Sequence, residues 1–388
     1  MKNKPDYDGG SIVNLMSTIS GCFNVDSKYS ELKDLSSNDL KKYDNIVTLV
    51  IDGLGYNFVN KTKDNLIKDN VISKITSVFP TTTAACITSF ATGLAPMNHG
   101  ITGWFMKVKK DRKVFPSTIL LFNNRRTGKQ LTDYGIMPKD IFIDNRLSKG
   151  IKDITVIHPE ATNNSTYSNY MLDGAKKLNY KDLQDYFLVT AQAVKKKCIT
   201  QKYIYSYLPD FDGVFHELGG KSKEIKELYS KINSELKKFL KNIKGTNTLV
   251  LITADHGLKD NSPASRFKMN DYPQIVDLLN FPLCGEPRAA YCYVKRGMND
   301  KFEKVVKEQL SHAFYLKRSK DMIKDEYFGL YEPTPQFKHR VGDYILLAKK
   351  NYVIKDFLPR EEVKYHMADH GGLSEDELFV PLCKFEVK

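Results

Sequence analysis

The sequence predicts an α/β fold in which helices cover a mostly parallel central sheet. Four short apolar runs rich in β-branched residues end in polar residues, as buried strands do. They occupy residues 46–51, 154–158, 203–207 and 248–252. Stretches with helical periodicity lie between them, over 180–197 and 222–242. This alternation of strands and helices is typical of a parallel sheet with helices on its faces.

Each element has a local reason. The run 46–51 (IVTLVI) carries no charge, as expected of a strand buried on both faces. The stretch 222–242 has leucine and isoleucine at spacings of three and four, which predicts an amphipathic helix. Residues 77–93 contain Pro80, three threonines and a final Gly93, which are signals for the start and end of a helix.

Two stretches interrupt the alternation. Residues 105–150 are basic and irregular, and residues 260–362 carry strand and helix candidates of their own, such as 289–294, 300–311 and 344–348. The second stretch is long enough for an inserted lobe. We therefore expect one domain over 1–388 with an inserted lobe or cap over 260–362.

Composition limits the class of protein. The chain has 388 residues, 41% of them hydrophobic and 27% charged, which excludes a disordered polymer, a fibre and a disulfide miniprotein. The six cysteines form no Cys-x-x-Cys pair and are expected to be reduced. No apolar run approaches the roughly 18–20 residues that cross a bilayer, and the amino terminus does not resemble a signal peptide. We expect a cytoplasmic protein without a membrane partner.

The net charge of +13 comes mostly from lysines spread along the chain. Such a charge attracts polyanions, but the basic stretches lack the aromatic interleaving of a nucleic-acid module. A lysine-biased, solvated surface is the simpler interpretation. Nucleic acid is therefore expected only as a substrate.

Carboxylates and imidazoles follow the expected strands. In open α/β sheets, ligands bind beyond the carboxyl ends of the strands, where such side chains converge. The residues are Asp52 after 46–51, Asp210, Asp212 and His216 after 203–207, Asp255 and His256 after 248–252, and Asp369 and His370 near the carboxyl terminus.

Aspartate and histidine without thiolates suit zinc, manganese or iron. There are more such ligands than one ion needs. Two ions about 3.5–4 Å apart are a common device for in-line displacement at phosphorus. The alternative for each single pair is structural, because Asp-Gly after a strand is often only a turn and an Asp-His pair can cap a loop.

The threonines at 81–83 open the expected helix. Helix amino termini bind phosphate, and a threonine hydroxyl placed there can act as a nucleophile. The alternative is that one threonine simply caps the helix.

Together these motifs resemble the alkaline phosphatase superfamily, and within it the type I phosphodiesterase/nucleotide pyrophosphatase family. The resemblance extends from residue 46 to about 382, in the family's order. It rests on Asp52 in VIDGLG, Pro80 to Thr83 ahead of Gly93, Asp212 and His216 in DGVFHELG, Asp255-His256-Gly257, and His370-Gly-Gly. It implies a three-layer sandwich around a mostly parallel sheet.

The resemblance also implies two divalent metal ions, with zinc expected and manganese or iron as alternatives. The implied ligands are Asp212, His216 and His370 for one ion, and Asp52, Thr83, Asp255 and His256 for the other. Thr83 is the implied nucleophile, because it keeps the family's Pro-Thr-x-Thr placement and its distance to Gly93. His366 competes with His370 as the last ligand, but lacks the following Gly-Gly.

Three residues are candidates for the substrate pocket. Trp104 and Tyr207 have aromatic rings that could stack on a base or aryl group, with core packing as the alternative. Arg288 could pair with a substrate phosphate, with a surface salt bridge as the alternative.

The sequence and the resemblance together predict a metal-dependent hydrolase of phosphodiester or pyrophosphate bonds. The expected substrate is a small phosphorylated molecule, a nucleotide, cleaved through a covalent phospho-threonine. The alternatives are a phosphomonoesterase or phosphonate hydrolase on the same scaffold, and a non-catalytic nucleotide or nucleic-acid binding protein.

Overall fold

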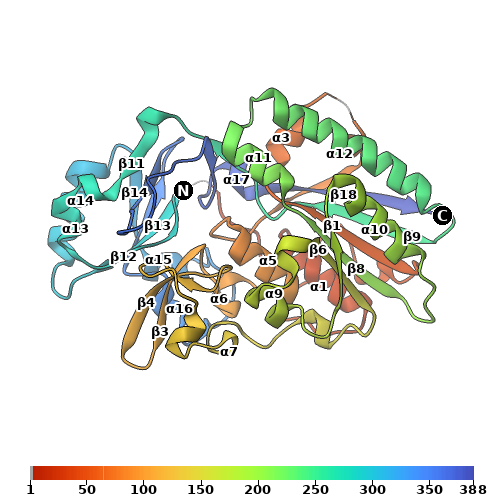
Figure 1. Ribbon diagram of the computed structural model, residues 1–388, viewed down its shortest axis with the longest axis horizontal. Coiled ribbons are helices and arrows are strands. Elements are labelled where there is room, and N and C mark those ends of the chain that lie inside the picture. Colours follow the sequence, from red (N-terminus) through yellow and green to blue (C-terminus); the bar gives the residue numbers. More distant parts are fainter. Residues whose placement is uncertain (1–2, 64) are drawn as a thin grey trace.

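The computed structural model describes residues 3–63 and 65–388, and two seven-stranded sheets form the framework of this part of the chain (Figure 1). The first sheet has the order β2 (Val71–Thr76), β18 (Phe379–Val387), β9 (Thr248–Thr253), β1 (Asn45–Ile51), β8 (Lys202–Leu208), β6 (Ile154–Pro159), β7 (Lys176–Tyr180). All four strands expected from the apolar runs are present, each within one residue of its predicted ends.

The register of this sheet brings the strand ends to one edge. β1 is parallel to both β8 and β9, and Val50 lies level with Tyr207 and Thr253. β18 is antiparallel to β9 and β2, so the sheet is mixed but mostly parallel. The residues that follow β1, β8 and β9 therefore converge at the same place, as parallel strands dictate.

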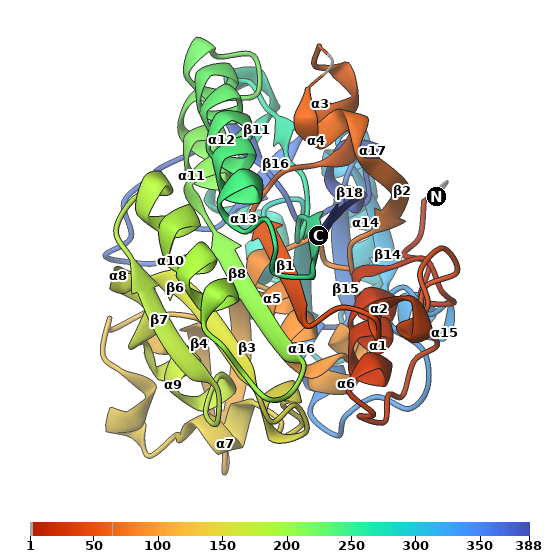
Figure 2. The ribbon, with the colours of Figure 1, turned by 90° about the vertical axis from the view of Figure 1, so that its right-hand side faces the viewer.

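Helices cover both faces of the first sheet. They are α1 (Ile12–Cys22) and α5 (Thr83–Thr92) on one face, and α10 (Leu183–Lys195), α11 (Asp210–Leu218) and α12 (Lys223–Asn242) on the other. Figures 1 and 2 show α12 and α1 on opposite sides of the sheet, which confirms the three-layer arrangement.

The expected helix over 180–197 begins later than its pattern indicated. Residues up to Tyr180 belong to β7, and Asp182 caps α10 by accepting a hydrogen bond from the Asp185 N–H. Ser222 caps α12 in the same way, through the Ile225 N–H. The helix over the threonines is also present: α5 ends at Gly93, which takes a left-handed conformation with φ +67°.

The second sheet forms a smaller lobe at the left of Figure 1. Its order is β14 (Phe314–Arg318), β15 (Tyr344–Ala348), β13 (Ala289–Val294), β12 (Leu279–Glu286), β3 (Phe105–Lys110), β4 (Lys113–Thr118), β5 (Asn123–Asn124). The sheet thus draws strands from both of the stretches that interrupt the alternation, and α14 (Asn299–Leu310) packs on it. The domain boundaries at 1–388 and 260–362 stay a prediction.

The junction of β3 and β12 within the lobe requires glycine. Phe105 of β3 pairs with Gly285 of β12. Gly103, just ahead of β3, approaches so closely that a Cβ there would lie 2.6 Å from the Gly285 Cα. This close approach brings Trp104 and Glu286 together beside the carboxyl edge of the first sheet.

The helices of the described residues include none that is both long and apolar enough to cross a membrane. The cysteines are free thiols, and five of the six are buried.

Candidate active site

Two groups of potential metal ligands lie at the carboxyl edge of the first sheet. Asp52 follows β1, and Asp255 and His256 follow β9. Each of these residues offers one ligand atom within 4.8 Å of the other two. The His256 Nε2 is 3.4 Å from the Asp255 Oδ2 and 3.6 Å from the Asp52 Oδ1.

The second group combines a helix with a short strand. Asp212 and His216 lie one turn apart on α11, with the His216 Nε2 3.3 Å from the Asp212 Oδ2. His370 follows β17 (Ala368–Asp369) and completes the group within the same 4.8 Å limit. The His256 and His370 rings stack with centroids 3.9 Å apart, so the two groups adjoin.

Backbone carbonyls orient the imidazoles. The Nδ1 of His216 is 2.7 Å from the Ala368 carbonyl oxygen, and that of His370 is 2.8 Å from the Thr81 carbonyl oxygen. A carbonyl only accepts hydrogen bonds, so each Nδ1 carries the proton and donates it. The Nε2 lone pairs then face the two groups, which is the usual arrangement of metal-binding histidines.

The aspartates have oxygen atoms without partners. Within the described part of the chain, the buried Asp52 Oδ1, Asp212 Oδ1 and Asp255 Oδ2 accept no hydrogen bond. Burial, then the charges of Asp255 and Asp212, raises the pKa of Asp52 well above its ordinary value. Burial likewise raises the pKa of Asp212 and lowers that of His370. Unpaired buried carboxylates are costly, so the residues present fit divalent cations.

Thr83 is the first residue of α5 and faces the same two groups. Its hydroxyl oxygen is 3.2 Å from the His256 Nε2. Its neighbours are engaged elsewhere. The Thr81 hydroxyl donates to the Gly372 carbonyl and accepts from the Gly371 N–H, and the Thr82 hydroxyl donates to Glu286.

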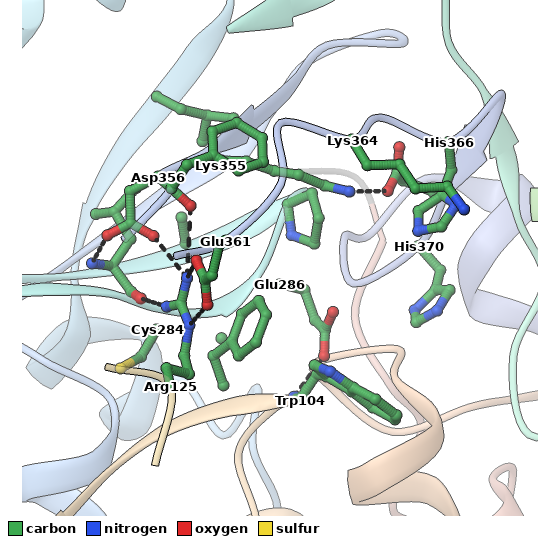
Figure 3. Close-up of a pocket in the computed structure, with 18 of the residues that line it drawn as sticks. Trp104, Arg125, Cys284, Glu286, Lys355, Asp356, Glu361, Lys364, His366 and His370 are labelled. Carbon is green, nitrogen blue, oxygen red and sulfur yellow. Dashed lines mark hydrogen bonds and ion pairs between the residues drawn. The ribbon is translucent and has the colours of Figure 1, made fainter. Parts of the chain in front are cut away.

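A cavity of about 530 Å³ opens in front of these residues (Figure 3). One end is lined by Thr83, Asp212, His216 and His370. The lobe supplies the other walls, which include Trp104, Phe105 and Glu286. Trp104 therefore lies where a substrate group could contact it, in agreement with its place among the candidate pocket residues.

Tyr207 does not lie in this cavity. Its side chain is buried, stacks on His158 with ring centroids 5.3 Å apart, and donates its hydroxyl hydrogen to the Asp52 Oδ2. The hypothesis that it stacks on a substrate base is wrong, because the buried ring packs against His158 of β6 and does not line the cavity. Tyr207 instead fixes the orientation of Asp52.

Arg288 is also unavailable to substrate. The side chain is 1% exposed, and its Nε is 2.7 Å from the Glu377 Oε1. The two Nη atoms donate to the carbonyls of Tyr352 and Lys350, at 2.8 and 3.0 Å. The hypothesis of a phosphate-binding arginine is therefore wrong, and the alternative of a salt bridge holds, although the bridge is buried.

His366 lies beside the second group without joining it. Its ring centroid is 4.6 Å from that of His216, and it lines the cavity. The carboxylate and imidazoles that approach within 4.8 Å of one another are those of Asp212, His216 and His370. The geometry agrees with the preference for His370 over His366.

Two residues of the cavity escaped the sequence analysis. Glu286 is buried, and burial raises the pKa of its carboxyl to about 7. Arg125 pairs with Asp356 and Glu361 at 3.2 and 2.8 Å. In the sequence, Glu286 is marked only by its position two residues before Arg288, at the end of an apolar run. That position does not indicate which of the two residues reaches the cavity.

Known proteins share this architecture. Murine ectonucleotide pyrophosphatase/phosphodiesterase 5 superposes with a TM-score of 0.63 at 14% identity, and the human protein with 0.64 at 15%, each over 87% of both chains. Phosphonoacetate hydrolase from Sinorhizobium meliloti, in complex with phosphonoformate, superposes with a TM-score of 0.59 at 14% identity, over 88% of this chain and 90% of that one. At these identities the likeness concerns the fold, which is that of the alkaline phosphatase superfamily.

No curated protein sequence matches the chain significantly. The family model for type I phosphodiesterase / nucleotide pyrophosphatase, however, matches residues 46–372, which include every candidate ligand and the threonine helix. The chain therefore belongs to the type I phosphodiesterase/nucleotide pyrophosphatase family, a family of phosphoryl hydrolases.

Proposed function

We propose that this protein is a metal-dependent hydrolase of phosphodiester or pyrophosphate bonds in nucleotides, with Thr83 as the nucleophile. One proposed metal site consists of Asp212, His216 and His370, and the other of Asp52, Thr83, Asp255 and His256. Zinc is the expected metal, with manganese or iron as alternatives. The cytoplasm is the expected location.

A single observation carries the proposal. Two adjoining groups of buried or half-buried ligands leave three carboxylate oxygens without a partner among the described residues, and the Thr83 hydroxyl lies 3.2 Å from a histidine of one group. Buried anions without partners are retained where a cation binds. The nucleotide class of substrate is supported by a murine relative of the same fold, whose inactive variant was solved in complex with AMP.

The reaction follows from where these residues lie. Bound divalent ions supply the positive charge that stabilises phosphoryl oxygens and lowers the pKa of a hydroxyl. The Thr83 oxygen forms a bond to phosphorus as the bond to the leaving oxygen breaks, and its proton leaves to solvent. Water then attacks the phospho-threonine, and the bond between phosphorus and the Thr83 oxygen breaks.

The orienting hydrogen bonds serve this chemistry. Because α5 begins at Thr83, the N–H groups of its first turn point toward the incoming phosphate. The hydrogen bonds of Thr81 to Gly371 and Gly372 join the start of this helix to the segment that carries His370. Nucleophile and ligands are therefore held in one rigid arrangement before substrate binds.

The first experiment measures the hydrolysis of bis-p-nitrophenyl phosphate and p-nitrophenyl phosphate by protein stripped of metal and then given zinc or manganese. We expect turnover only with metal and a preference for the diester. Thr83→Ala should remove turnover while metal still binds, and Thr83→Ser should retain part of it. Near wild-type turnover by Thr83→Ala would contradict the nucleophile assignment.

Phosphonate or phosphomonoester hydrolysis is the second candidate. Phosphonoacetate hydrolase shares the fold with a TM-score close to that of the nucleotide pyrophosphatases. Phosphonoacetate belongs in the same assay, with phosphate release as the measurement. Metal-restored cleavage of phosphonoacetate or of the monoester, without cleavage of the diester, would replace the first proposal by the second.

A further inference from the structure

Glu286 is a buried carboxylate of the lobe that reaches the catalytic end of the cavity. It is the last residue of β12 and is 7% exposed. Its Oε1 accepts hydrogen bonds from the Thr82 hydroxyl and, at 2.6 Å, from the Trp104 N–H. A Cβ added to Gly371 would lie 2.3 Å from the Glu286 Cβ, so the backbone beside His370 packs directly on this side chain. Glu286 is thus wedged between the residues that neighbour the proposed nucleophile and a proposed ligand.

The second carboxylate oxygen of Glu286, Oε2, accepts no hydrogen bond from the described residues. In residues 3–63 and 65–388, both hydrogen bonds to this carboxylate go to Oε1, and no lysine or arginine pairs with it. Figure 3 shows the carboxyl group directed into the cavity above Trp104. Three other acids in the cavity walls are neutralised, since Asp356 and Glu361 pair with Arg125 and Asp369 with Lys355. A carboxylate that lines the cavity with one unused oxygen is suited to a donor on the ligand.

The chemistry of the site selects the kind of donor. A phosphate oxygen carries negative charge and would be repelled by a carboxylate. An ammonium group would be repelled by the cations that the neighbouring groups are suited to hold. A neutral hydroxyl donates a hydrogen bond without either penalty, and hydrogen bonds to an ionised acceptor are the stronger ones.

We propose that Glu286 is a specificity residue that accepts a hydrogen bond from a hydroxyl group on the alcohol portion of the phosphoester, such as the ribose diol of a nucleotide. This inference rests on the proposed function and deepens it, because it names the substrate feature that the lobe recognises. A substrate without such a hydroxyl offers no donor to the second oxygen of Glu286 and loses that part of the binding energy.

The variant Glu286→Gln is suited to test this role. The glutamine side-chain oxygen can still accept from Thr82 and Trp104, so the start of α5 keeps its support. At an assay pH above the raised pKa of Glu286, the substitution removes a negative charge from the cavity and turns a charge-assisted hydrogen bond into a neutral one. Glu362→Gln is the matched control, because Glu362 is an exposed carboxylate in the wall of the same cavity.

The experiment compares the p-nitrophenyl ester of a ribonucleoside 5′-phosphate with its 2′,3′-dideoxy counterpart. We expect the metal-loaded wild type to prefer the diol in kcat/KM by about tenfold to a hundredfold. Glu286→Gln should reduce this preference to about fivefold or less, through a larger loss of kcat/KM on the diol ester than on the dideoxy ester. Glu362→Gln should keep the full preference.

Two results would contradict the inference: no preference for the diol in the wild type, or an unchanged preference in Glu286→Gln. Equal loss on both esters would mean a purely structural role for Glu286 and would also contradict it. Bis-p-nitrophenyl phosphate distinguishes failure of this inference from failure of the proposed function. It has no hydroxyl, so its metal-restored turnover tests catalysis alone.

A binding measurement keeps the test independent of turnover. Calorimetric titration of metal-loaded protein with adenosine 5′-monophosphate and with its 2′,3′-dideoxy analogue should show the same preference in Kd, reduced in Glu286→Gln. If both nucleotides bind with equal affinity to the wild type, Glu286 does not recognise the diol, whatever the enzyme hydrolyses.

Discussion

The two ends of the cavity differ in how their charges are balanced. At the sheet end, the carboxylates of Asp52, Asp212 and Asp255 leave buried oxygen atoms without partners among the described residues. At the lobe end, Arg125 of the cavity wall, and Arg288, which lies in the lobe outside the cavity, are enclosed by carboxylates and carbonyls that use their donors. Buried groups that satisfy one another support the fold, whereas unsatisfied anions require something from outside. The difference separates the candidate catalytic residues from the structural ones.

Removing one unpaired carboxylate has the largest expected effect. Asp52→Asn should lower diesterase activity by at least about a hundredfold. Mutation of a residue that only hydrogen-bonds to a metal ligand already lowers activity or metal affinity by about 10–100-fold. Without metal, the variant should be more stable than the wild type by about 1–2 kcal/mol, because it removes a charge from a cluster of buried acids. Activity assays and denaturant unfolding in chelator provide the two measurements.

Asp210→Asn is the matched control for this prediction. Asp210 is an exposed aspartate at the same edge, outside both ligand groups. Its substitution should change neither activity nor metal-free stability. The contrast between the two ends of the cavity would be mistaken if Asp52→Asn destabilised the metal-free protein.

Arg288 tests the lobe end. Arg288→Met leaves Glu377 buried without its cation, which should cost about 3–5 kcal/mol of unfolding free energy. Activity per folded molecule should hardly change, because Arg288 does not face the cavity. Denaturant unfolding and KM for a diester are the measurements, and Glu377→Gln in the Arg288→Met background should recover part of the stability. A KM raised tenfold with unchanged stability would restore Arg288 to the substrate pocket.

Substitution of Tyr207 tests whether a buried residue outside the cavity supports the metal site. Tyr207→Phe removes the hydroxyl that orients Asp52 and should weaken metal affinity by about 10–100-fold. Titration of metal into stripped protein measures this directly. Tyr205→Phe is the control, because Tyr205 lies on the same strand with a buried hydroxyl that makes no hydrogen bond. Equal metal affinities for the two variants would contradict a role of Tyr207 in orienting Asp52.

The local sequence pattern was sufficient to predict the two groups of potential metal ligands, but it was insufficient to predict which residues form the cavity walls. Asp52 and Asp255 each follow an apolar strand, and parallel strands in register must bring such residues together. Tyr207 could not be assigned in this way, since its contact with Asp52 depends on which strand lies beside β8. Glu286 and Arg288 stand two residues apart, and only the packing of β12 against Gly103 and Gly371 decides which one reaches the cavity.

The smallest predicted effect concerns His99, a buried histidine away from both ligand groups. Its Nδ1 accepts from the Ile101 N–H at 3.1 Å, and its Nε2 therefore donates to the Ser89 hydroxyl. A second proton, on Nδ1, would face the Ile101 N–H, which is itself a donor. Burial and the charge of Arg340 lower the pKa of His99 to about 3, against 6.5 for an unperturbed histidine.

The sign of the pH effect follows from these values. Below pH 6.5 the unfolded chain binds a proton at His99 and the folded chain does not, so stability falls as the pH is lowered toward 3. The slope from this residue is about 1.4 kcal/mol per pH unit. Between pH 6 and 5, His99→Gln should show a dependence weaker by that amount than the wild type in metal-free denaturant unfolding. Parallel pH dependences for the variant and the wild type would mean that His99 is protonated in the folded protein, which its two hydrogen bonds do not permit.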